Sequence, residues 1–247
     1  MFKVEIKLKE TNINLTKGII ELNHPFSKIK GPIFIGRTWK EYLRMFNLNL
    51  DDLIDGKVLD CAAGASSFTA EMSNRGHDVR AVDILYNEEA DLLCDKCKEH
   101  MEVLVEGLAS VDSFIWSFFR DLEDLKEQRN QACSEFIMDY KNHKNRYISA
   151  DLTDLPFEEG TFKMVLCSHL LFIYDHRLDY EFHLKSIQEM LRVSSSELRI
   201  YPLVKNRGLK SEFVNHIIKD LPDVQTEIVK VNYEFRKGGN EMLKLTK

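Results

Sequence analysis

Long apolar runs are missing from this sequence. No stretch of its 247 residues approaches the roughly 18 apolar residues that a membrane-spanning helix needs. The opening stretch, MFKVEIKLKETN, carries charges where a secretory signal would need an apolar centre. We therefore expect no membrane partner and a cytoplasmic location.

The sequence also lacks an excess of basic residues. Its 34 lysines and arginines are outnumbered by 40 aspartates and glutamates, which gives a net charge of -6. Such a surface does not favour a polyanion, although a local basic patch is compatible with this composition. We expect no nucleic-acid partner.

Cysteine is sparse, and its spacing does not favour a metal site. Cys94 and Cys97 form a lone C-x-x-C motif, with His100 three residues further on. This spacing alone is compatible with a zinc or redox site, but no second C-x-x-C motif follows. Apolar residues recur around the motif at steps of three and four, which predicts that the thiols lie on a helix and are partly buried. We expect no metal site and no disulfides.

Glycine is scarce where a nucleotide-binding turn would need it. Residues 58–86 predict a strand, a tight turn, a helix and a second strand, and the turn contains only Gly64, close to Ala62. The three glycines of a dinucleotide site and the lysine of a phosphate-binding loop are both absent. Asp83 ends the second strand, where a carboxylate can accept hydrogen bonds from two ribose hydroxyls. The pattern indicates a site for a nucleoside without phosphates.

These residues resemble the S-adenosylmethionine-binding motifs of the class I methyltransferase family. The stretch from Asp60 to Gly64 matches the first motif in a glycine-poor form, and Asp83 matches the ribose-binding acid. The match continues over residues 148–176, where Asp151 takes the place of the acid beside the adenine. The likeness covers residues 55–205 and departs at Lys163, where an acid is usual.

The resemblance implies a Rossmann-like α/β fold, in which a doubly wound, seven-stranded, mostly parallel sheet has a reversed last strand. The last two strands are expected over residues 226–235 and 241–245. Residues 56–247 would form the methyltransferase domain, with S-adenosylmethionine as cofactor and S-adenosylhomocysteine as product. The residues expected at the cofactor are Arg37, Asp60, Ala62, Gly64, Asp83, Ile84, Asp151, Leu152 and Ser168.

Residues 87–145 are an insertion between the second and third strands, too long for a structureless loop. Apolar periodicity predicts two helices, over residues 88–107 and 110–140. Phe118 and Phe119 belong to a stretch of the second helix that is apolar on more than one face. We interpret this helix as a cap whose phenylalanines line a substrate pocket; the alternative is a helix buried on two sides.

Residues 1–55 form an N-terminal extension. Residues 4–8 and 18–22 have the patterns of strands, and Thr38 can cap a helix that, by the resemblance, closes over the cofactor. Arg37 lies at the entrance of this helix. Because a guanidinium matches a carboxylate bidentately, Arg37 is a candidate partner for the carboxylate of S-adenosylmethionine; the alternative is a solvated charge.

The reaction leaves little signature in the sequence, because an activated sulfonium methyl group needs mainly alignment and, for some acceptors, a base. His169, after the fourth strand, is the candidate base, and Tyr174 is a candidate pocket residue; a structural histidine is the alternative. We expect a methyltransferase acting on a small-molecule or natural-product acceptor. Two alternatives stay open: a cyclase or lyase that releases methylthioadenosine, and a non-catalytic S-adenosylmethionine-binding protein. The sequence leaves the oligomeric state open.

Overall fold

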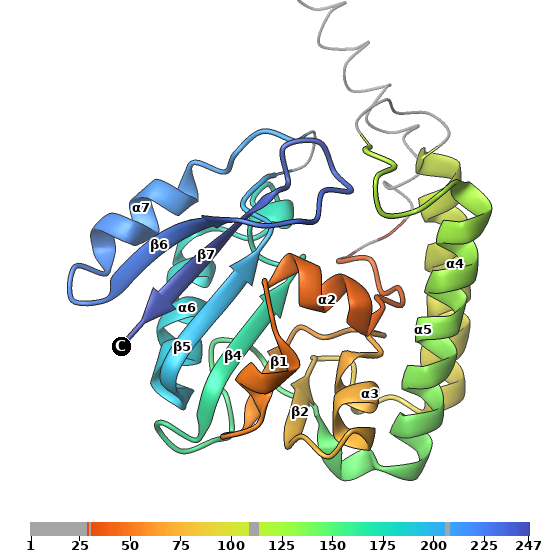
Figure 1. Cartoon of the computed structure of the whole chain (residues 1–247), viewed down its shortest axis with the longest axis horizontal. Helices are drawn as coiled ribbons and strands as arrows, with labels where there is room; N and C mark the ends of the chain where they lie inside the picture. The colour runs from red at the N-terminus through yellow and green to blue at the C-terminus, as the bar shows by residue number, and fades with distance from the viewer. Residues whose placement is uncertain (1–28, 30, 109–113, 206–207) are drawn as a thin grey trace, which may run out of the picture.

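The computed structural model describes residue 29 and residues 31–108, 114–205 and 208–247. A seven-stranded sheet in the order β3-β2-β1-β4-β5-β7-β6 forms its centre (Figure 1). Strand β7 runs antiparallel to both β5 and β6, while the other pairs are parallel. This confirms the predicted Rossmann-like sheet with a reversed last strand. The strands are β1 (Val58–Cys61), β2 (Val79–Val82), β3 (Tyr147–Ile148), β4 (Phe162–Ser168), β5 (Ser194–Tyr201), β6 (Gln225–Lys230) and β7 (Glu241–Thr246).

Helices cover both faces of this sheet (Figure 1). The α-helices are α2 (Trp39–Met45), α3 (Phe68–Asn74), α4 (Ala90–Leu108), α5 (Leu122–Asn142), α6 (Tyr180–Val193) and α7 (Phe213–Asp220). Short 3-10 helices are η2 (Leu50–Leu53), η3 (Lys144–Arg146) and η4 (Phe172–Tyr174). No helix within the described part of the chain is long and apolar enough to cross a membrane.

The central strand β4 shows why the sheet is covered twice. Met164 and Leu166 belong to a core cluster shared with α2 and α3, whereas Val165 and Cys167 belong to a second cluster shared with α6 and α7. Side chains alternate between the two faces of a strand, so a strand with four successive apolar residues, Met164 to Cys167, needs helices on both sides.

The insertion after β2 contains the two predicted helices, but the second begins later than expected. Helix α5 begins at Leu122, after Asp121, whose side chain accepts a hydrogen bond from the backbone N–H of Asp124 at 2.8 Å. Residues 114–121 are not helical. Phe114 instead pairs with Arg236 in an antiparallel bridge, and the N–H of Ile115 donates to the carbonyl of Phe235 at 2.7 Å. Pairing with a segment distant in sequence therefore overrides the local helical pattern.

The two ends of the chain also bear on the sequence predictions. Thr38 caps α2 in a capping box with Glu41, as expected. The predicted strand over residues 226–235 is wrong at its end, because β6 stops at Lys230 and the following residues turn toward the bridge with Phe114. The strands expected over residues 4–8 and 18–22 lie outside the described residues.

A buried ion pair connects the insertion to α2. Arg129 of α5 donates to both carboxylate oxygens of Glu41, with 2.7 Å between Nη2 and Oε1. The same carboxylate accepts hydrogen bonds from the hydroxyl of Tyr233, at 2.5 Å, and from the backbone N–H of Thr38, at 2.9 Å. The buried Glu41 carboxylate is therefore neutralised by Arg129 and hydrogen-bonded at both oxygens.

Candidate functional site

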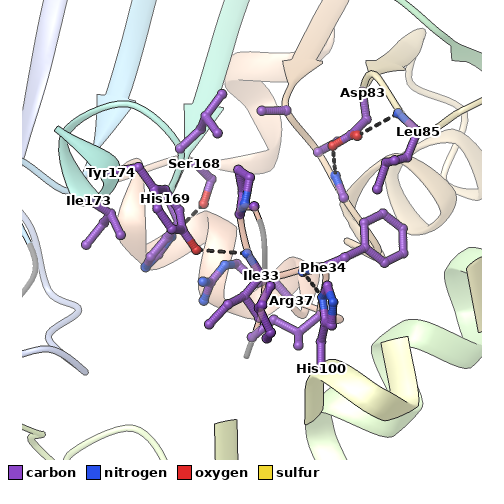
Figure 2. Close-up of a pocket in the computed structure, with 18 of the residues that line it drawn as sticks. Ile33, Phe34, Arg37, Asp83, Leu85, His100, Ser168, His169, Ile173 and Tyr174 are labelled. Carbon is purple, nitrogen blue, oxygen red and sulfur yellow. Dashed lines mark hydrogen bonds between the residues drawn. The ribbon is translucent and has the colours of Figure 1, made fainter. Parts of the chain in front are cut away.

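A cavity of about 600 Å³ opens at the carboxyl ends of the central strands. Its wall comes from the ends of β1, β2 and β4, from α4, from the segment before α2 and from the segment before β7. Figure 2 shows Asp83 on one side of this cavity, His169 and Tyr174 on the other, and Arg37 between them in this view. This is the edge at which open α/β sheets bind ligands.

The turn after β1 forms the floor beside Asp83. Ala62 and Gly64 both have a positive φ, of 53° and 57°. The backbone N–H of Gly64 donates to Oδ2 of Asp83 at 3.0 Å, and that of Leu85 donates to Oδ1 at 3.0 Å. Burial raises the pKa of Asp83, and these two donors act in the opposite direction. The carboxylate is thus held in one orientation by the backbone.

Beyond Asp83 the wall is formed by further residues that the sequence predicts at the cofactor. Ile84, whose side chain is 63% exposed, and the buried Leu152 both line the cavity. Asp151 lies next to them, and its Oδ1 accepts hydrogen bonds from the N–H and hydroxyl of Thr153 at 2.8 and 2.7 Å. Oδ1 is therefore held by Thr153, and no hydrogen bond from the described residues is seen at Oδ2.

Asp60 lies in β1, before the turn, and is not among the residues that line the cavity. Its side chain is fully buried, and its Oδ1 accepts a hydrogen bond from the hydroxyl of Tyr42 at 3.1 Å. Burial raises the pKa of Asp60 well above its ordinary value. Asp60, which the sequence predicts at the cofactor, is therefore not part of the cavity lining, and its Oδ2 is buried without a hydrogen bond from the described residues.

A strap of residues 31–37 crosses the cavity. The backbone N–H of Ile33 donates to the hydroxyl of Tyr174 at 2.8 Å, and that of Phe34 donates to Nδ1 of His100 at 2.8 Å (Figure 2). Arg177 donates to the carbonyl of Gly31 at 3.0 Å. Side chains from α4 and from the segment after β4 therefore fix the strap on both sides.

His169 stands at the opposite side of the cavity from Asp83. It has a positive φ of 54°, and its Nδ1 lies 2.8 Å from the hydroxyl oxygen of Ser168. Burial, followed by the charges of Arg37, Arg129 and Arg236, holds the pKa of His169 well below its usual range. The imidazole is therefore neutral at neutral pH, and its buried, positively charged surroundings make it a weaker base than a free histidine.

Arg37 contributes a positive charge to the cavity wall, and the charge of Glu41 acts to raise the pKa of its guanidinium. The charges of Glu41 and Arg129 both act on Arg37, but the Glu41 carboxylate is hydrogen-bonded to Arg129, which binds it bidentately. No salt bridge to Arg37 is seen among the described residues. Burial and the nearby Arg129 lower the pKa of the Arg37 guanidinium, which nevertheless stays charged.

Phe118 and Phe119 do not line the cavity. Phe119 is buried, and its ring packs edge to face on Phe235, while Phe118 packs on Tyr233. Because residues 114–121 are not helical, these rings turn into the core, and Phe114 is the aromatic of this segment that reaches the cavity. The predicted site residues that do line the cavity are Arg37, Ala62, Gly64, Asp83, Ile84, Asp151, Leu152, Ser168, His169 and Tyr174.

No protein-family model matches the chain. The uncharacterized protein MJ0045 of Methanocaldococcus jannaschii is 37% identical to it over 220 residues, covering 88% of this chain and 97% of that protein. The chain belongs to the MJ0045 family.

Solved structures similar to this MJ0045-family member include the magnesium protoporphyrin IX methyltransferase of Synechocystis PCC 6803 with bound S-adenosylmethionine. That structure is 12% identical, with a TM-score of 0.44, over 84% of this chain and 80% of its own. A S-adenosylmethionine-dependent methyltransferase of Methanosarcina mazei is 12% identical, with a TM-score of 0.40, over 80% of this chain and 94% of its own.

Sequence reasoning missed several wall residues of this MJ0045-family member. His100 was noted only beside the C-x-x-C motif, and Arg177 and Arg236 were not singled out. Each reaches the cavity through contacts between segments far apart in the chain, and such contacts leave no local spacing to detect. Among the described residues, no group of three histidines, cysteines or acids could hold a metal ion.

Proposed function

We propose that the protein transfers a methyl group from S-adenosylmethionine to a small-molecule or natural-product acceptor. The observation that carries this proposal is the Asp83 carboxylate, oriented by two backbone N–H groups at the edge of the cavity. Each carboxylate oxygen has about two lone-pair sites, and each uses one for the backbone. Both oxygens therefore keep a site for a ribose hydroxyl.

The rest of this side fits the same cofactor. Ile84 and Leu152 offer apolar surface for an adenine, and Asp151 offers an acceptor for its amino group. At Gly64, a Cβ would face only the Phe34 ring, at 3.7 Å, so the missing side chain leaves open space beside the turn. Arg37 is the proposed partner of the cofactor carboxylate.

The chemistry needs few protein groups. When bound, S-adenosylmethionine supplies the methyl group: the lone pair of the acceptor forms the new bond to the methyl carbon, and the breaking C–S bond leaves its electron pair on sulfur. We assign His169 as the base for an acceptor that carries a proton. In the tautomer in which Nδ1–H donates to the hydroxyl of Ser168, Nε2 carries the lone pair that takes up this proton.

The cavity suits a small acceptor. Its volume of about 600 Å³ lies within the roughly 300–1,000 Å³ of small-molecule sites, and the strap covers part of it. Helix α4 adds Lys96, His100 and Leu104 to the wall, so we propose that the helical insertion acts as a cap over the acceptor.

Analysis of nucleoside products tests this function. The full chain is incubated with S-adenosylmethionine, with and without a small-molecule extract of its host, and the nucleosides are measured by mass spectrometry. S-adenosylhomocysteine that forms only with the extract is the expected result. Methylthioadenosine formed without extract would instead identify a cyclase or lyase, and binding without any product would identify a non-catalytic protein.

A further inference from the structure

Helix α4 presents three side chains to the cavity, one from each of three successive turns. Lys96, His100 and Leu104 are spaced four residues apart, so they lie on one face of the helix, and all three line the cavity. Lys96 is half-buried, whereas His100 and Leu104 are only 8% and 7% exposed. Along this helix the wall therefore changes from charged, through polar, to apolar.

The apolar end of this wall continues onto three other segments. Ile35 of the strap and Phe235 of the segment before β7 belong to the same core cluster as Leu104. Phe114 packs against that cluster, and the centres of the Phe114 and Phe235 rings are 5.0 Å apart. All four residues line the cavity, and none of them comes from the strand ends that form the proposed adenosine site. We call these four residues the apolar subsite.

Three arginines of the cavity wall already have partners within the protein. Arg129 is bound bidentately to Glu41, and Arg177 donates to two backbone carbonyls of the segment before α2. The guanidinium of Arg236 packs on the Phe114 ring, 5.2 Å from its centre, and Arg236 has a further interaction within the chain. These three charges therefore need no partner from a ligand.

His100 supplies a polar contact beside the apolar subsite. Its Nδ1 accepts a hydrogen bond from the backbone N–H of Phe34 at 2.8 Å, so the hydrogen of the neutral ring is on Nε2 (Figure 2). Burial, followed by the charge of Lys96, lowers the pKa of His100, and Glu99 acts in the opposite direction. No hydrogen bond from Nε2 to the described residues is seen. His100 thus offers the cavity a neutral donor, one helical turn from Leu104.

From this arrangement we infer that the methyl acceptor is an apolar small molecule with a hydrogen-bond-accepting oxygen: its body packs on the apolar subsite, and its oxygen accepts the Nε2–H of His100. The inference rests on the proposed function and adds the chemical class of the acceptor. Apolar surface that leaves water at this subsite favours binding, and the hydrogen bond to His100 orients the molecule. His100 and Leu104 are then specificity-determining residues for the acceptor.

Solvent partition of the acceptor tests its chemical class. A small-molecule extract of the host is divided at neutral pH between water and ethyl acetate. Each fraction is then incubated with the full chain and methyl-labelled S-adenosylmethionine. We expect the ethyl acetate fraction to support most of the formation of S-adenosylhomocysteine, and the labelled product to pass into ethyl acetate. Acceptor activity found mainly in the water fraction would overturn the inference.

The variant His100→Asn tests the hydrogen bond. Asparagine carries an acceptor oxygen on Cγ, where histidine carries Nδ1, so the bond from Phe34 can be kept while the donor at Nε2 is lost. The initial rate at limiting acceptor should fall by at least about 10-fold, and the Kd for S-adenosylhomocysteine should stay within about threefold of the wild type. His216→Asn, at an exposed histidine of α7, is the matched control and should change neither quantity.

The variant Leu104→Ala tests the apolar subsite. It removes apolar surface from the wall, so the initial rate at limiting acceptor should fall by about 10-fold. The Kd for S-adenosylhomocysteine should again stay within about threefold of the wild type, since Leu104 lies outside the proposed adenosine site. Leu92→Ala, at a leucine of the same helix that is 57% exposed, is the matched control and should leave both quantities unchanged.

The outcomes separate this inference from the proposed function. S-adenosylhomocysteine formed mainly with the water fraction, or at an unchanged rate by either variant, would leave the methyltransferase standing and overturn the apolar acceptor. A loss of affinity for S-adenosylhomocysteine as large as the loss of rate would also overturn it, because the role of these residues would then be structural. Failure to form S-adenosylhomocysteine with any fraction would overturn the proposed function, and the acceptor inference with it.

Discussion

At the scale of single residues, Ala62 stands in the turn after β1 at a position where a glycine would be expected. Its φ of 53° lies in the left-handed region, where an L-residue with a Cβ is strained and glycine is not. The sequence showed a turn short of glycine but not which residue took this conformation. The structure shows that alanine occupies a position suited to glycine.

Replacing Ala62 by glycine should therefore stabilise the protein. We expect Ala62→Gly to raise the free energy of unfolding by about 0.5 kcal/mol, since relief of the left-handed strain exceeds the added entropy of the unfolded chain. Denaturant unfolding measures this. Ala63→Gly is the matched control, because Ala63 does not have a positive φ, and it should lose about 0.5 to 1 kcal/mol. Equal losses in both variants would refute the strain at Ala62.

His169 combines an unusual backbone conformation with a low pKa. Because asparagine tolerates the left-handed region and can bond to Ser168 but cannot serve as the base, His169→Asn isolates the proton transfer. We expect kcat to fall by about 100-fold, with the Kd for S-adenosylhomocysteine within about threefold of the wild type. Full turnover by this variant would remove His169 from the reaction.

The pH dependence of His169 has a defined sign. Its pKa in the folded protein lies well below the ordinary value of about 6.5, so the imidazole binds a proton more readily in the unfolded chain. Stability should therefore be lost as the pH falls below about 6.5, and this loss should be smaller in His169→Asn. Denaturant unfolding of the wild type and of His169→Asn at pH 7.5 and 5.5 checks this prediction. An identical pH dependence of stability in the two proteins would contradict the low pKa of His169.

At the scale of elements, the ion pair between Glu41 of α2 and Arg129 of α5 joins the insertion to the rest of the fold. The helical periodicity of the insertion was readable from sequence, and both helices are present. The attachment of these helices to α2 could not be predicted from the sequence, because it depends on a salt bridge between residues 88 positions apart. The same applies to residues 114–121, where a distant bridge to Arg236 replaces the helix that the local pattern favoured.

Removing one partner of this ion pair should lower the free energy of unfolding. Glu41→Gln leaves the buried Arg129 charge uncompensated, so we expect a loss of about 3–5 kcal/mol in the free energy of unfolding. The double variant Glu41→Gln with Arg129→Met, which removes both charges, should recover part of this loss. Denaturant unfolding of the three proteins checks the prediction. A loss below 1 kcal/mol in Glu41→Gln would show that the pair does not hold α2 to α5.

At the scale of the whole molecule, the sequence indicated the seven-stranded sheet with its reversed last strand, and the wall of the cavity around Asp83, better than the opposite wall. The turn, Asp83 and Asp151 lie on consecutive strands whose carboxyl ends meet at one edge, so their spacing carries the geometry. The opposite wall of the cavity is built by the strap, the segment after η4 and the segment before β7. Its arginines come together only in the folded chain, within a protein whose overall charge is negative.

The measurement that tests the central claim most directly is calorimetric titration of the full chain with S-adenosylmethionine. We predict one binding site per chain, an affinity at least about 10-fold weaker in Asp83→Ala, and unchanged affinity in Asp78→Asn, at the exposed opposite end of β2. Circular dichroism of Asp83→Ala is the control that shows whether this variant is folded. Absence of binding in the wild type, or equal affinity in folded Asp83→Ala, would contradict the assignment of this cavity to S-adenosylmethionine.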